Sequence, residues 1–206
     1  MSIRLCKTLA VALVAAFAPP AGASAQDRTT AAAVDVARLS VWRTISLGVP
    51  GGRYALFDAL DAQGIHVGDA AEEVLHRPAF TVSRSRGSVQ LARVSVAQLG
   101  FAEPATLAEI YRRAVRSGLE LCPAEIAPQL RLQYRDQPAG HFLHVAMHPI
   151  ATYSGELFGL SLGNGGAGLI LAGVDGRPDA VMPPQAVFVF VHPERIALPG
   201  GAADPH

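Results

Sequence analysis

The sequence predicts one domain of the α+β class, with a mainly antiparallel sheet of about six to seven strands and two or three helices in the N-terminal half. Half of the 206 residues are hydrophobic, which is enough apolar content for a folded core. Helical periodicity is confined to the N-terminal half, whereas alternating apolar segments separated by Gly, Asn, Pro and Asp dominate the C-terminal half. Neither an internal repeat nor a shift in composition indicates a second domain.

The first 25 residues have the pattern of a secretory signal peptide. Arg4 and Lys7 provide the positive start, residues 8–18 form an apolar run, and residues 23–25 are a small-residue cleavage site. A retained membrane anchor is the weaker alternative, because spanning a bilayer needs roughly 20 apolar residues. We therefore expect Sec-type export to the periplasm or outside the cell, and a mature chain that does not span a membrane.

The mature chain is predicted to begin with a flexible segment, residues 26–40, before a folded domain over 41–195. The alternating, β-branched residues 41–47 predict a strand, and residues 48–52 break it. Leu56, Phe57 and Leu60 form the apolar stripe of a helix over 53–63. A short helix through residue 75 follows, with Asp69 as its expected N-cap.

A β-hairpin and a well-defined helix are expected next. Residues 80–83 and 88–96 flank a turn at residues 84–87, where Gly87 suits the left-handed position. Thr106 and Glu109 have the spacing of a capping box, and the helix that they start is expected to end at Gly118.

The rest of the chain is predicted to be mainly strands. A proline-rich loop over 122–128 precedes residues 130–134, whose alternation predicts a strand. Further strands are expected at 142–150, 156–162, 168–174 and 186–191, before a flexible tail at 196–206. The glycine-rich residues 163–168 are predicted to be a turn and not a phosphate loop, because they open no helix.

Charge and cysteine content exclude further classes of protein. With 17 basic and 17 acidic residues the chain has no net charge, which argues against a nucleic-acid partner. Removal of the signal peptide leaves Cys122 as the single cysteine, so an internal disulfide is not expected.

Four segments of the chain match a recurring signature in one order. The signature runs W-x-T-I, V-S-V-A-x-L-G-F, L-C-P-A-E-x-x-P-x-L-R-L-x-Y-x-x-Q-P and F-V-F-V-x-P, and it matches residues 42–45, 94–101, 121–138 and 188–193. In these segments the chain resembles a family of uncharacterised bacterial proteins. The resemblance covers most of the mature chain and implies no activity. Where the family has Gly-Glu, this chain has Gly140-His141, which puts any role of that acidic position in doubt here.

Glu125 and Arg131 are the candidate catalytic residues. A carboxylate on a proline-braced loop can serve as a general acid or base if burial tunes its pKa towards neutrality. Alternatively, Glu125 pairs with an arginine and simply fixes the loop.

A row of polar residues forms the candidate ligand-binding set. On the predicted strand, Arg131, Gln133 and Arg135 share one face, and Gln137 follows. Such a row can bind a carboxylate or a phosphate through forked hydrogen bonds. The alternative is that it merely faces water.

Metal, cofactor and cysteine chemistry are not expected. His144 and His148 lie roughly 13 Å apart on a strand, and His141 points to its other face, so the three cannot share one ion. Cys122 next to Leu121 is expected to be buried and inert, although a nucleophilic role with a histidine as base is an alternative.

Two hypotheses of function follow. The favoured one is an exported domain that binds a polar small molecule or an envelope protein, since no nucleophile motif, metal cluster or cofactor fingerprint is present. The alternative is a small cell-envelope hydrolase with Glu125 as general acid or base and with Arg131 and Gln137 orienting a polar substrate. A secreted inhibitor or immunity-like protein is a third possibility.

Overall fold

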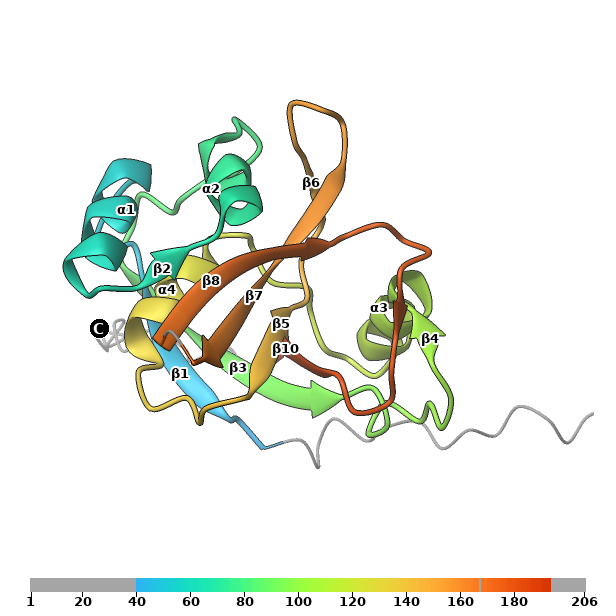
Figure 1. The fold of residues 1–206 in the computed structure, drawn as a ribbon. Helices are drawn as coiled ribbons and strands as arrows, with labels where there is room; N and C mark the ends of the chain where they lie inside the picture. The colour runs from blue at the N-terminus through green and yellow to red at the C-terminus, as the bar shows by residue number, and fades with distance from the viewer. Residues whose placement is uncertain (1–39, 167, 194–206) are drawn as a thin grey trace, which may run out of the picture. The chain divides into compact units, whose positions relative to one another are not determined.

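A computed structural model describes residues 40–166 and 168–193 of the protein. The predicted signal peptide (1–25), nearly all of the segment 26–40 and the tail 196–206 lie outside the described residues. Within the described part, one curled sheet is combined with four helices (Figure 1). None of these helices is long and apolar enough to cross a bilayer.

The four helices lie between the first and the fifth strand along the chain, and only strands follow them in the described residues. The helices are α1 (Arg53–Ala62), α2 (Asp69–His76), α3 (Leu107–Arg116) and α4 (Ile126–Gln133). The strands are β1 (Arg43–Leu47), β2 (His66–Val67), β3 (Gly87–Ser95), β4 (Ala105–Thr106), β5 (Phe142–Val145), β6 (Ile150–Ala151), β7 (Leu157–Gly165), β8 (Gly168–Asp175), β9 (Val181–Met182) and β10 (Val187–Val191).

The main sheet has the order β1-β3-β10-β5-β7-β8-β2, with β6 paired to β7, and β4 and β9 form a separate pair. Most neighbouring strands are antiparallel, but β10 pairs with β5, and β2 with β8, in parallel. The predicted α+β class with a mainly antiparallel sheet is therefore confirmed.

Alternation along β10 divides the core into two layers. Val189 and Val191 belong to one buried cluster, whereas Phe188 and Phe190 belong to the other. The two sets point to opposite faces because successive strand side chains alternate. Both faces of β10 are covered, so its sequence is continuously apolar.

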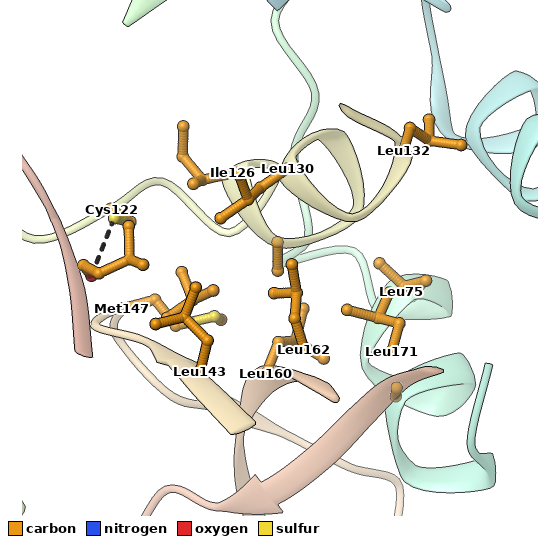
Figure 2. Packing of buried hydrophobic residues seen from close by; sticks show 14 of the residues in the cluster. Leu75, Cys122, Ile126, Leu130, Leu132, Leu143, Met147, Leu160, Leu162 and Leu171 are labelled. Atoms are coloured by element: carbon orange, nitrogen blue, oxygen red, sulfur yellow. Dashed lines mark hydrogen bonds between the residues drawn. The ribbon is translucent and has the colours of Figure 1, made fainter. Parts of the chain in front are cut away.

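The first layer contains α4 together with α1 and α2. Ile126 and Leu130 of α4 lie over Leu143, Leu160 and Leu162 of the sheet (Figure 2). Leu75 of α2 meets Leu171 of β8 beside them (Figure 2). Helix α4 is thus packed between the sheet and other helices, so its polar side chains are buried or half-buried.

The second layer is made by α3, apart from the other helices (Figure 1). Ile110 and Ala114 are buried in the same cluster as Phe188 and Phe190. The helix begins with the predicted capping box: the Thr106 hydroxyl accepts a hydrogen bond from the Glu109 amide at 3.3 Å, and the Glu109 carboxylate accepts one from the Thr106 amide at 2.9 Å.

The predicted strand over 130–134 is wrong, because these residues belong to α4 and to its C-terminal cap, Tyr134. Every residue from 126 to 132 is buried, so the helix has no polar face and shows no amphipathic period. Pro128 lies in the first turn, where its missing N–H interrupts no helical hydrogen bond.

The predicted hairpin around residues 84–87 is also wrong. Residues 80–83 form no strand, and β3 pairs instead with β1 and β10. The predicted strand 142–150 is divided into β5 and β6, and the N-cap of α2 is Gly68, with Asp69 as the first helical residue. The predicted turn over 163–168 is too long, because residues 163–165 belong to β7 and pair with β8, which begins at Gly168.

Candidate functional site

The predicted site residues do not form one exposed row. Arg131 is fully buried (0% exposed), Gln137 and Glu125 are each 3% exposed, Gln133 is half-buried and Arg135 is exposed. Arg131 and Gln133 would share one face of a strand, but in a helix they point in different directions. The predicted row of ligand-binding residues therefore does not exist.

Arg131 is held inside a network of hydrogen bonds. Its guanidinium donates to the side-chain oxygen of Gln137, to the carbonyl of Tyr134 and, at 3.3 Å, to the carbonyl of Gly163. Burial lowers the pKa of Arg131 to about 10. All of these acceptors are neutral, so the structure contains a buried guanidinium that is solvated by protein oxygens.

Gln137 extends the network to the sheet. Its side-chain amide donates to the carbonyls of His141 at 2.9 Å and of Leu162 at 3.1 Å, and the Asn164 amide donates to its backbone carbonyl at 2.6 Å. Arg131 and Gln137 therefore attach the loop after α4 to the end of β7. The geometry supports a positioning role for both residues, and Arg131 is fully buried.

Gln133 pairs with the edge of β1. Its side-chain oxygen accepts from the Ser46 amide at 2.9 Å, and its side-chain nitrogen donates to the Ser46 carbonyl at 2.9 Å. The amide thus takes the place of a neighbouring strand and covers part of an open sheet edge.

Glu125 binds Ser83. Its carboxylate accepts hydrogen bonds from the Ser83 amide at 3.0 Å and from the Ser83 hydroxyl. The expected alternative, a pair with an arginine, is wrong, because the described ion pairs are Arg43–Asp136 and Arg177–Asp175. No hydrogen bond joins Glu125 to Arg131 or Gln137 in the described residues.

A pocket of about 280 Å³ lies beside the Arg131 network, and we call it the arginine–aromatic pocket. Tyr134 and Gln137, from the segment 125–137 that contains the predicted site residues, line it. The complete lining is Arg93, Gln98, Tyr134, Gln137, His141, Phe142, Leu143 and Val187.

Cationic and aromatic groups are stacked next to this pocket. The guanidinium carbon of Arg93 lies 5.3 Å from the ring centroid of Trp42, and that of Arg43 lies 4.6 Å from the ring of Tyr134. The rings of Trp42 and Tyr134 meet edge to face, with centroids 5.1 Å apart. Arg43 is also paired with Asp136 at 3.0 Å.

Arg93 is not among the residues that the sequence pattern indicates as a site. It lies on β3, and only the pairing of β3 with β1 and β10 brings it near residues 42 and 187. The signal in the sequence is a charged residue between the apolar residues 91–92 and 94, which indicates an exposed position but does not identify the partners.

Cys122 and the histidines carry no visible site. Cys122 is buried, as expected, and donates from its sulfur to the Val189 carbonyl at 3.4 Å (Figure 2). Burial raises the pKa of its thiol, which disfavours the nucleophilic thiolate. Across residues 40–166 and 168–193, no three His, Cys, Asp or Glu side chains are grouped to hold a metal ion.

The chain matches no protein-family model, no curated protein and no solved structure. The resemblance to an uncharacterised bacterial family therefore stays a prediction, and the case for function rests on the geometry.

Proposed function

We propose that this is an exported binding protein for a small organic anion with an apolar body, and that the ligand occupies the arginine–aromatic pocket. The observation that carries the proposal is an exposed arginine, Arg93, which has no carboxylate partner among the described residues and lies at the wall of a pocket with both polar and apolar lining residues. Export rests on the signal-peptide pattern of the first 25 residues.

Arg93 is suited to bind an anion. Within the described residues the ion pairs involve Arg43 and Arg177, so the charge of Arg93 is not neutralised by a neighbouring carboxylate. Its contact with the Trp42 ring restrains the side chain, while a stacked guanidinium keeps its N–H edge free for a forked hydrogen bond. A carboxylate is the simplest ligand group that matches this edge.

Four of the other lining residues favour an apolar ligand body, and Gln98, Gln137 and His141 add polar groups beside them. Phe142 is 58% exposed, although large apolar side chains are usually buried, and Leu143, Val187 and Tyr134 adjoin it in the pocket. A volume of about 280 Å³ is near the lower limit of ligand pockets. The ligand class is therefore a small carboxylate with an aromatic ring or a short alkyl chain.

A buried hydrogen bond fixes one of the residues that line the pocket. Gln137 lines it, and the buried guanidinium of Arg131 fixes the Gln137 side chain. A preformed pocket loses less conformational entropy on binding, which favours affinity.

Titration calorimetry on the chain from residue 27 onwards tests the proposal with benzoate, phenylacetate and hexanoate. Benzyl alcohol serves as the neutral ligand. We expect carboxylate binding that Arg93→Gln weakens about 10- to 100-fold, as the loss of charge-assisted hydrogen bonds predicts. Arg116→Gln, at an exposed position on α3 away from the pocket, is the matched control.

Two results contradict the proposal. One is equal binding of benzyl alcohol and the carboxylates, which removes the role of charge. The other is equal weakening by Arg93→Gln and Arg116→Gln, which shows unspecific attraction of anions.

A further inference from the structure

We propose that Ser83 is a nucleophile and that Glu125 is its general base, in an ester-binding pocket separate from the arginine–aromatic pocket. The two pockets share no lining residue, so this inference does not depend on the proposed binding function.

The geometry joins a buried base to an accessible hydroxyl. The carboxylate of Glu125 accepts a hydrogen bond from the Ser83 hydroxyl. Its other oxygen accepts from the Ser83 amide at 3.0 Å, which fixes the direction of the pair. Glu125 is 3% exposed, whereas Ser83 is half-buried and lines a pocket of about 510 Å³.

The charge of Glu125 is balanced by few groups. No arginine forms an ion pair with it among the described residues, and its hydrogen bonds come from Ser83. Both carboxylate oxygens instead face the amide and hydroxyl of Ser83, which is the placement that a general base for this hydroxyl requires. A carboxylate that served only to fix a loop would be better stabilised by a cation.

The nearby arginines have different surroundings. Arg53 donates to the carbonyls of His76, Arg77 and Phe80 at 2.9–3.0 Å, so it holds the wall of the pocket in place. Arg84 is exposed and also lines the pocket, where its guanidinium can stabilise a developing oxyanion.

The reaction is acyl transfer to Ser83 followed by hydrolysis. The Ser83 oxygen attacks the ester carbonyl carbon while its proton moves to Glu125, which forms a C–O bond and a tetrahedral oxyanion. Collapse breaks the bond to the leaving alcohol, which takes the proton from Glu125. Water then attacks the carbonyl carbon of the acyl-serine while its proton moves to Glu125. Collapse breaks the bond to the Ser83 oxygen, which takes the proton back from Glu125, and the carboxylic acid is released.

The remaining lining residues indicate the substrate class. Tyr54, Phe80 and Val82 give the pocket an apolar wall, and Tyr54 is 76% exposed at its mouth. Esters with a short apolar acyl group fit this surface.

Labelling with a fluorophosphonate reagent, located by peptide mass spectrometry, tests the proposal on the chain from residue 27 onwards. We expect covalent labelling of Ser83 and none in Ser83→Ala. Glu125→Gln is expected to slow labelling and hydrolysis of 4-nitrophenyl butyrate at least tenfold, because general-base catalysis contributes about 10²- to 10⁴-fold. Glutamine retains one acceptor oxygen for the Ser83 amide, while its NH2 group can donate to the Ser83 hydroxyl oxygen. The melting temperature checks that each variant is folded.

Ser85→Ala is the matched control, because Ser85 is exposed, lies two residues away and is absent from the pocket lining. It is expected to react like the wild type. Folded Glu125→Gln protein that is labelled as fast as the wild type overturns the proposal, as does a wild-type chain that is labelled at Ser85 or not at all. None of these outcomes would contradict the proposed binding of carboxylates at Arg93, which is measured separately.

Discussion

Arg131 carries the largest of the fully buried side chains, although it is a charged residue. Removing a guanidinium from water is costly, and this cost is offset here by the oxygens of Tyr134, Gln137 and Gly163. The Arg131 Nε atom has no partner among the described residues. The network therefore stabilises the fold mainly by satisfying backbone and amide oxygens that would otherwise be buried without a donor.

Replacement of Arg131 by methionine is predicted to destabilise the domain. The chain segments around residues 134–141 and 163 lose their common donor, and each buried acceptor left unsatisfied costs about 1–3 kcal/mol. Because the cost of burying the charge also disappears, we expect a net loss of about 2–4 kcal/mol in the free energy of unfolding. Urea unfolding measures the change. Arg135→Met, at an exposed neighbour, is expected to stay within about 0.5 kcal/mol of the wild type; equal stability of the two variants would show that the network contributes nothing.

Residue type alone identified part of the candidate site. The segment from Glu125 to Gln137 was singled out for its polar groups, and it does contain the buried network and one wall of the pocket. The roles were missed because they depend on partners distant in sequence: Ser83 for Glu125, Ser46 for Gln133 and Gly163 for Arg131. Neither spacing nor composition contains those pairings.

Helix α4 shows why local pattern failed at one element. Leu130, Leu132 and Tyr134 alternate with polar residues as in a half-exposed strand, yet α4 is surrounded on all sides and buries Gln129 and Arg131 as well. Helix α3 keeps an exposed polar face and a capping box, and its helical period was therefore recognised. Of these two helices, the one with a solvent-exposed face was predicted and the one without such a face was not.

At the edge of β1, Gln133→Ala is predicted to free the backbone of Ser46. Two hydrogen bonds at 2.9 Å are lost, which we expect to cost about 1–2 kcal/mol in the free energy of unfolding. Hydrogen exchange followed by mass spectrometry should show faster exchange in the peptide that contains β1. Gln185→Ala, at an exposed position outside the sheet edge, is the control and should leave that peptide unchanged. Unchanged exchange in Gln133→Ala would mean that the edge is protected in another way.

The start of α3 gives a second prediction for an element. Thr106→Ala removes the hydroxyl that accepts from the Glu109 amide, and loss of such a cap costs about 1 kcal/mol. Thr106→Ser keeps the hydroxyl and should retain most of the stability. Thermal unfolding of the two variants distinguishes a capping effect from the loss of the threonine methyl group. Loss of the methyl group alone would lower the melting temperatures of Thr106→Ala and Thr106→Ser equally.

For the whole domain, the free energy of unfolding is expected to depend on alkaline pH through a tyrosine in the second core layer, on one face of β10. Tyr111 packs in the second layer, with ring centroids 6.0 Å from Phe188 and 6.3 Å from Phe190. Burial raises the pKa of Tyr111 to about 12, although a hydrogen bond with the Met147 backbone partly opposes this shift. In the unfolded chain the phenol ionises near pH 10. The folded state therefore holds its proton longer.

The sign of the pH dependence follows from that difference. The stability due to Tyr111 is fully present below about pH 10 and is lost as pH rises towards about 12, because the unfolded chain releases the proton first. Between about pH 9 and pH 11.5 we expect the wild type to lose about 2 kcal/mol more than Tyr111→Phe. Arg131, whose lowered pKa acts in the opposite direction, is present in both proteins and cancels in the comparison.

Urea unfolding at the two pH values gives the measurement, with Tyr54→Phe, at a 76% exposed position, as the control that should follow the wild type. Equal losses in Tyr111→Phe and the wild type would place the alkaline sensitivity outside this layer of the core.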